Sequence, residues 1–91
     1  MLAIWLVSLS AFAQSSLRGI VKSTSGEELL GANVVLVGTG RGSNSDLKGK
    51  FEIRNIPDGK YTLRVSYLGF ESFSQEIQLP DPTELQVVLS P

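Results

Sequence analysis

The chain lacks the two side chains on which much enzyme chemistry depends, because its 91 residues include no cysteine and no histidine. Neither a Ser-His-Asp system nor a Cys-His nucleophile can be assembled from this chain. Zinc sites are excluded as well, since carboxylates alone rarely hold zinc. Without disulfides, the fold has to rest on its hydrophobic core. The sequence predicts no catalytic residue, metal site or cofactor; carboxylate or lysine chemistry and a calcium or magnesium site are the only routes left.

An excess of positive charge is also missing. Nine acidic and eight basic side chains give a formal net charge of −1. Nucleic-acid binding requires clustered Lys and Arg that displace counterions from the phosphates. Here the cations are scattered singly along the chain: Arg18, Lys22, Arg41, Lys48, Lys50, Arg54, Lys60 and Arg64. We therefore expect no nucleic-acid partner.

No apolar run reaches the ~20 residues that a helix needs to cross a bilayer. The N-terminus carries a shorter run over residues 2–7, followed by Ala11-Phe12-Ala13-Gln14. This pattern predicts a secretory signal peptide over residues 1–13, cut between Ala13 and Gln14, and one domain over residues 14–91. The alternative is a buried N-terminal strand or helix. No Lys or Arg precedes the run, and no Cys follows it for lipid attachment.

What the chain does contain is a series of short strand patterns separated by turn residues. Residues 17–22, 50–54, 61–67, 73–79 and 85–89 are strand patterns, several of them with alternating apolar side chains. The nearly continuous apolar run 32–37 predicts a central strand covered on both faces. A short strand near residues 43–45 is also expected. The pattern predicts an all-β fold, a two-sheet β-sandwich of six or seven short strands.

Two loops imitate ligand sites. Residues 44–49 resemble a calcium loop, but Lys48 stands where the third oxygen ligand should be and Asn55 stands where the bidentate Glu should be. A turn closed by the Asp46 carboxylate is therefore favoured. The segment 38–42 resembles a phosphate loop, but no helix follows it and the Gly-Lys-Ser/Thr ending is absent. A flexible or left-handed connection is expected there. Arg41, at its tip, is a candidate partner contact, with a solvated charge as the simpler interpretation.

The remaining candidates are acidic and aromatic. Glu27 and Glu28 are adjacent, so in an extended chain they point to opposite sides and cannot act as a catalytic pair. Tyr61 and Tyr67 alternate with the buried face of their strand, which favours core packing over a binding platform. Phe70 follows the break at Gly69; it is the aromatic to test for exposure and, with Arg41, a candidate partner contact.

The order and spacing of these motifs resemble the carboxypeptidase regulatory-like domain family, over about residues 17–89. The motifs are Gly19-Ile20-Val21, Gly26-Glu27, Leu30-Gly31-Ala32-Asn33-Val34, Gly38-Thr39, Gly42-Ser43, Asp46, Gly49-Lys50-Phe51, Ile56-Pro57, Gly59, Tyr61, Leu63 and Ser66-Tyr67-Leu68-Gly69-Phe70-Glu71. In particular they are similar to the version at the N-terminus of TonB-dependent outer-membrane receptors of the starch-utilisation type. The resemblance implies a transthyretin-like (prealbumin-like) β-sandwich, exported to the periplasm or outer membrane, without catalysis of its own.

This resemblance leads to our functional prediction: a non-catalytic accessory domain of a TonB-dependent uptake system that acts through protein–protein contacts. The expected partner is a receptor plug or barrel, or a periplasmic component, and association with the outer membrane is expected only through that partner or a downstream region. The chain stops at Pro91, so we expect either a fragment of a longer product or a free-standing secreted domain. Alternatives are a free-standing exported module that binds carbohydrate or protein, and an accessory domain of a secreted peptidase.

Overall fold

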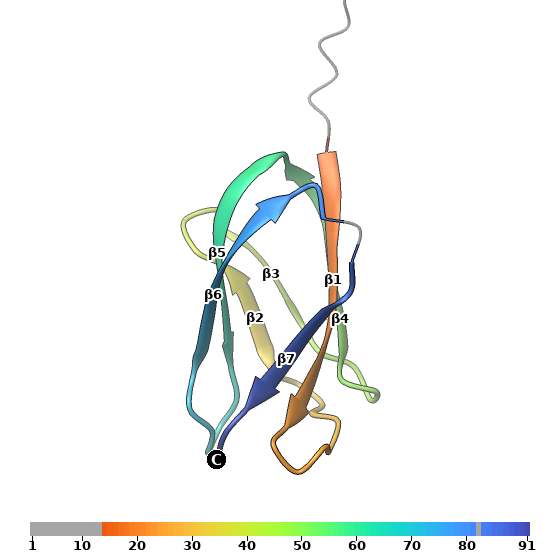
Figure 1. Cartoon of the computed structure of the whole chain (residues 1–91), viewed down its shortest axis with the longest axis vertical. Helices are drawn as coiled ribbons and strands as arrows, with labels where there is room; N and C mark the ends of the chain where they lie inside the picture. Colours follow the sequence, from red (N-terminus) through yellow and green to blue (C-terminus); the bar gives the residue numbers. More distant parts are fainter. Residues whose placement is uncertain (1–13, 82) are drawn as a thin grey trace, which may run out of the picture.

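The computed structural model describes residues 14–81 and 83–91, so the expected signal peptide over residues 1–13 lies outside the described residues. The described residues form strands joined by turns (Figure 1). The strands are β1 (Gln14–Ser23), β2 (Asn33–Leu36), β3 (Arg41–Asn44), β4 (Lys50–Pro57), β5 (Gly59–Ser66), β6 (Phe73–Leu79) and β7 (Leu85–Leu89). The predicted all-β class with six or seven short strands is confirmed.

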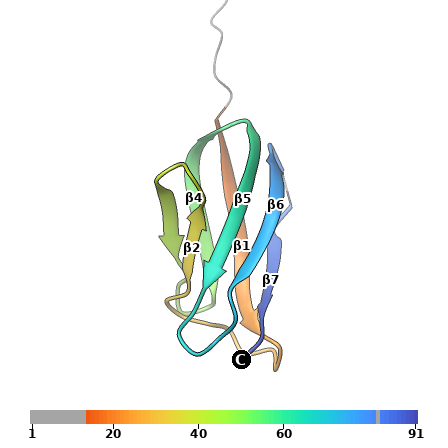
Figure 2. The same cartoon turned by 90° about the vertical axis from the view of Figure 1, so that its left-hand side faces the viewer.

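The strands form two sheets that face each other, which confirms the β-sandwich (Figures 1 and 2). One sheet has three strands in the order β4-β1-β7, with β1 antiparallel to β4 and parallel to β7. The other has four antiparallel strands in the order β3-β2-β5-β6. The chain passes between the sheets at Asp58, where β4 of one sheet leads directly into β5 of the other.

The core lies between the sheets and is built from one face of each strand, because alternate side chains of a strand point to opposite faces. Strand β5 shows the pattern: Leu63 and Val65 are fully buried, whereas Arg64 between them is exposed. Burial of one such aliphatic side chain contributes about 1.5–3 kcal/mol. The buried apolar residues are Leu17, Val21, Leu29, Ala32, Val34, Leu36, Phe51, Ile53, Ile56, Leu63, Val65, Ile77, Leu79, Val87 and Leu89.

The apolar run 32–37 was predicted to be covered on both faces, and that prediction is wrong. Val34 and Leu36 are fully buried, but Val35 between them is only half-buried and Val37 is 44% exposed. Strand β2 is central in its sheet, yet the sheet is antiparallel and covered on one face only. Such sheets commonly leave the other face to solvent.

An extra residue in β4 explains why its buried positions do not alternate strictly. Ile53 and Ile56 are both buried although they are three positions apart. Their partners on β1, Leu17 and Ser15, are only two residues apart, and Asn55 has the left-handed φ of 58°. This geometry is a β-bulge, which restores the inward direction of the strand after the extra residue.

The connections lie at two opposite ends of the sandwich (Figures 1 and 2). One end, called here the C-terminal end, consists of residues 24–32, 45–49, 67–72 and 90–91. The other, called the N-terminal end, consists of residues 37–40, Asp58 and 80–84, and the start of β1 lies beside it. Pro82 is not described.

Candidate functional site

The loop that imitates a calcium site is a turn closed by its own aspartate. Asp46 Oδ1 accepts hydrogen bonds from the backbone N–H groups of Lys48 and Lys50, both at 2.9 Å. These two bonds, that from Lys50 first, hold the pKa of Asp46 below its ordinary value. The backbone N–H of Gly49 donates to the carbonyl of Asp46 at 2.9 Å. The predicted Asx turn is confirmed, and the carboxylate serves the backbone.

The glycine-rich segment is the left-handed connection that was expected, but Arg41 is not at its tip. Gly38 and Gly40 have φ values of 80° and 71°. Thr39 Oγ1 closes the turn by donating to the carbonyl of Leu36 at 2.8 Å and accepting from the N–H of Arg41 at 3.0 Å. Arg41 is the first residue of β3 and pairs with Leu36, so its half-buried side chain lies on the core-facing side of an edge strand. Its role as a partner contact stays a prediction.

The aromatic side chains line the border of the core. Tyr61 and Tyr67 are half-buried and pack against the core, in keeping with the favoured interpretation. Phe70 also packs there, and its ring meets that of Tyr67 edge-on, with centroids 5.3 Å apart and planes at 78°. Phe70 is therefore half-buried rather than exposed. The exposed apolar side chain of this turn is Leu68, at 98%.

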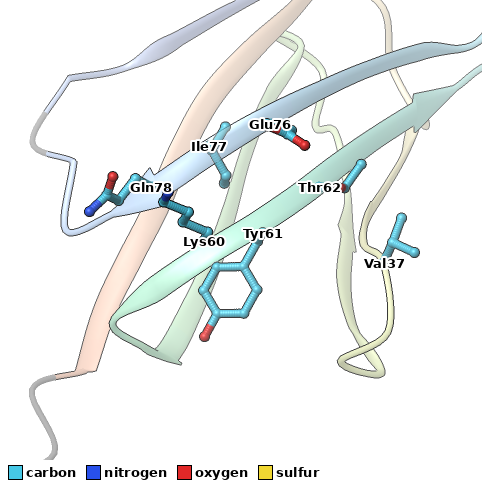
Figure 3. Close-up of a pocket in the computed structure, with 7 residues that line it drawn as sticks. All are labelled: Val37, Lys60, Tyr61, Thr62, Glu76, Ile77 and Gln78. Carbon is cyan, nitrogen blue, oxygen red and sulfur yellow. The ribbon is translucent and has the colours of Figure 1, made fainter.

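A hollow of about 470 Å³ lies over β5, β6 and the end of β2 (Figure 3). Lys60 is opposite Gln78 in the β5–β6 ladder, and Thr62 is opposite Glu76. The charges of Lys60 and Glu76 are of opposite sign and both side chains are exposed. The hollow is lined by Val37, Lys60, Tyr61, Thr62, Glu76, Ile77 and Gln78.

Paired charges lie on the outer face of the three-stranded sheet. Glu52 accepts hydrogen bonds from Arg54 and, at 2.8 Å, from Arg18. Arg54 first and Arg18 second hold the pKa of Glu52 below its ordinary value. Both arginines are largely exposed, and pairs of this kind contribute about 0–1 kcal/mol. The adjacent Glu27 and Glu28 are exposed on the loop between β1 and β2.

Two absences hold for the described residues. Among residues 14–81 and 83–91, no three acidic side chains come close enough together to hold a metal ion. Over the same part of the chain there is no helix with the length and apolar character needed to span a membrane.

The residues that sequence reasoning missed lie at the C-terminal end. Leu30, Leu47 and Leu68 are 52%, 81% and 98% exposed, although leucine is read from a sequence as a core residue. Ser45 is buried there: its hydroxyl donates to the carbonyl of Leu29 at 2.6 Å and accepts from the N–H of Ala32 at 2.8 Å. A signal for the leucines existed, because each precedes a glycine by one or two residues. No sequence signal identified Ser45.

Comparison with known proteins places this geometry in a family. The family model for the CarboxypepD_reg-like domain matches residues 17–91. TonB-dependent receptor SusC of Bacteroides thetaiotaomicron is 38% identical over 84 residues, which are 91% of this chain and 8% of the receptor. TonB-dependent receptor P3 of Formosa agariphila is 37% identical over 70 residues, 77% of this chain and 7% of the receptor. The chain thus spans less than a tenth of the length of these curated relatives.

Solved structures show the same fold in another context. A chain from a type II cohesin–X-dockerin complex of Acetivibrio cellulolyticus superposes with a TM-score of 0.60 at 18% identity, over 82% of this chain and 56% of that chain. A second chain, from a C-terminal interface mutant of that complex, superposes with a TM-score of 0.57 at 22% identity, over 84% of this chain and 51% of that chain. At these identities the likeness shows the fold alone.

Proposed function

Because the chain belongs to the carboxypeptidase regulatory-like domain family, we propose that it is an accessory domain of a TonB-dependent outer-membrane receptor. In this role it is exported after removal of residues 1–13, lies on the periplasmic side, and contributes protein–protein contacts without catalysis. The observation that carries the proposal is the 38% identity to TonB-dependent receptor SusC over 91% of the chain. Identity over so much of the chain favours a shared context as well as a shared fold.

The chemistry of the described residues supports a role in contacts. The carboxylates of Asp46 and Asp81 accept hydrogen bonds within their own turns, and Glu52 is paired with two arginines. The whole sequence offers no histidine or cysteine as a nucleophile or base. A folded domain whose sequence has neither histidine nor cysteine is better suited to presenting surfaces to other proteins or to ligands.

The coding sequence beyond residue 91 and a deletion test this function. We expect the reading frame to continue into a receptor, and deletion of residues 14–91 from that receptor to reduce substrate uptake while leaving the amount of receptor in the outer membrane unchanged. A matched control replaces the domain with a flexible Gly/Ser linker, which separates loss of the domain from loss of chain length. Unchanged uptake in the deletion, or a reading frame without a receptor, would contradict the proposal.

A further inference from the structure

Three exposed leucines lie at the C-terminal end, each in the same place within a turn. Leu68 is the second residue of the turn Tyr67–Phe70, in which the Phe70 N–H donates to the carbonyl of Tyr67 at 3.0 Å and Gly69 has φ of 86°. Leu47 is the second residue of the turn that the Gly49 N–H closes on Asp46. The second position of such a turn directs its side chain away from the chain.

Leu30 follows the same plan, with a side chain in place of the usual backbone bond. It is the second residue of the segment from Leu29 to Ala32, and Gly31 after it has φ of 83°. The Ser45 hydroxyl bridges the two ends of this turn, since it donates to the carbonyl of Leu29 and accepts from the N–H of Ala32. The turns therefore leave all three leucines exposed, Leu68 and Leu47 almost entirely and Leu30 by about half, so burial of Leu68 and Leu47 adds little to the stability of the fold.

Hydrogen bonds join the three turns and the last residues of the chain into one surface. Ser45 connects the β3–β4 turn to the β1–β2 loop. The N–H of Thr24 in that loop donates to the carbonyl of Leu89 at 3.0 Å. The N–H of Glu71 in the β5–β6 turn donates to the carbonyl of Ser90 at 2.7 Å. The leucines are thus held in place before any partner arrives, which lowers the entropic cost of binding.

We propose that the C-terminal end is a docking surface, and that its occupant is the receptor segment that follows residue 91. The inference rests on the proposed function, in which this chain is one part of a longer receptor. Pro91 lies at this end, next to the β5–β6 turn that carries Leu68 (Figure 1), and the bond from Glu71 to Ser90 ties it there, so whatever follows it starts at this end. The relatives are more than ten times longer than the matched region, since that region covers 8% of TonB-dependent receptor SusC.

The charges of the C-terminal end indicate the chemistry of the occupant, and the covalent connection bears on how tightly it docks. Exposed Glu27, Glu28 and Glu71 lie in the loops of the same end as the leucines, together with the exposed cation Lys48. The complementary surface is an apolar patch with basic residues at its rim. A covalently linked surface meets its partner at an effective concentration of roughly millimolar. A contact of three leucines that is weak between separate proteins is strengthened by this linkage.

Crosslinking in the full-length receptor tests the proposal. The 91 residues contain no cysteine, and any cysteine elsewhere in the receptor is replaced first. Leu68→Cys and, in a separate variant, Leu47→Cys then each introduce a single thiol, which is labelled with a benzophenone maleimide. Val37→Cys is the matched control, because Val37 is an exposed apolar residue (44%) at the N-terminal end. We expect photocrosslinks from both leucine positions to residues beyond 91 of the same polypeptide. We expect no such crosslink from Val37→Cys.

Every other outcome overturns the proposal. A crosslink between two copies of the receptor would make a second copy the occupant, and a crosslink to a different polypeptide would make it a separate protein. No product from either leucine position, or an equal yield from Val37→Cys, would show that this end docks nothing. A full-length receptor whose uptake needs the domain but gives no such crosslink would overturn the docking surface and leave the proposed function standing. A reading frame that ends at residue 91 would overturn both.

Discussion

The two ends of the sandwich differ in how their turns are held. At the C-terminal end, Ser45 ties one turn to another, and backbone bonds from Thr24 and Glu71 reach the last strand and the residues after it. At the N-terminal end, the side-chain bonds of Thr39 and Asp81 stay within their own turns. The bonds that leave a turn there reach a strand, since Ser15 Oγ of β1 donates to Asp58 at 2.8 Å and the Val37 N–H donates to the carbonyl of Thr62 in β5 at 3.0 Å. At the first end the turns are bonded to one another and have apolar tips, whereas in the described part of the second end the turns are bonded only within themselves or to a strand. The same sandwich thus bonds the turns of one end to each other and leaves those of the other end to local bonds and to the neighbouring strands.

The largest difference in stability between the two ends is expected when a glycine of each end is replaced by alanine. Gly49→Ala places Cβ 2.5 Å from the carbonyl oxygen of Val21 at a φ of 75°, so steric overlap adds to left-handed strain. We expect a loss of roughly 3 kcal/mol or more in the free energy of unfolding. Gly40→Ala has the same strain at φ of 71° but nothing within 4 Å, and we expect it to cost about 1–2 kcal/mol.

Urea denaturation of both variants beside the parent chain measures this difference. A loss of 3 kcal/mol corresponds to a fall in Tm of more than about 10 °C for a domain of this size. Equal losses for the two variants would show that the C-terminal end is no more tightly packed than the other.

Removal of the Ser45 hydroxyl tests the link between two turns of the C-terminal end. Ser45→Ala deprives the buried carbonyl of Leu29 and the N–H of Ala32 of their partner. Each unsatisfied buried group costs about 1–3 kcal/mol, so we expect a loss of roughly 2–3 kcal/mol. Ser43→Ala is the control, since that hydroxyl makes a single 3.4 Å bond at an exposed position, and we expect a change within about 0.5 kcal/mol. Similar Tm values for the two variants would contradict the bridging role.

The strands and several turns could be predicted from the sequence, because their causes are local. Alternation identified the buried faces of β4 and β5, and the bonding capacity of aspartate predicted the turn at Asp46. The position of Arg41 could not be found in this way, because the β2–β3 register decides whether it belongs to the turn or to the strand. The same holds for the half-buried Phe70, whose contact with Tyr67 depends on the path of the whole turn.

The candidate site was predicted less well than the fold. Hydropathy assigns leucine to the core, so Leu30, Leu47 and Leu68 read as ordinary apolar residues until the turns place them outside. Ser45 is polar and was expected only as part of a short strand, yet it is buried with both hydrogen bonds satisfied. Residues whose role depends on bringing distant segments together carry no local signal.

Low pH tests how much the negative charge of an aspartate stabilises its turn, at Asp46 of the C-terminal end and at Asp81 of the N-terminal end. Hydrogen bonds from their own turns lower the pKa of Asp46 and of Asp81 below the ordinary value of 3.8. A carboxylate with a lowered folded pKa contributes stability that is fully present above the ordinary value and is lost as pH falls through the folded pKa. We expect Asp46→Asn and Asp81→Asn each to be less stable than the parent near pH 7.

The difference in the free energy of unfolding between the parent and each asparagine variant should become smaller as the pH falls below about 3.8. Urea midpoints measured between neutral pH and about pH 2.5 check it, because the remaining carboxylates titrate alike in parent and variant. A gap that does not change with pH at Asp46 would show that its two backbone bonds are equally good with a neutral acceptor. A gap that narrows at Asp81 alone would remove the parallel between the ends.

The smallest change in the free energy of unfolding is expected at Leu68, the most exposed of the three leucines. Leu68 is 98% exposed, so Leu68→Ser removes no core contact, and the free energy of unfolding should change by less than about 0.5 kcal/mol. Two residues away, Phe70→Ala removes the edge-on contact with Tyr67, and we expect it to cost about 1–2 kcal/mol, the order of one partly buried aromatic with its ring pair. Thermal denaturation of the two variants separates a leucine kept for contact from an aromatic kept for packing. A large loss from Leu68→Ser would mean that this leucine stabilises the fold, and the C-terminal end would then differ from the N-terminal end in packing alone.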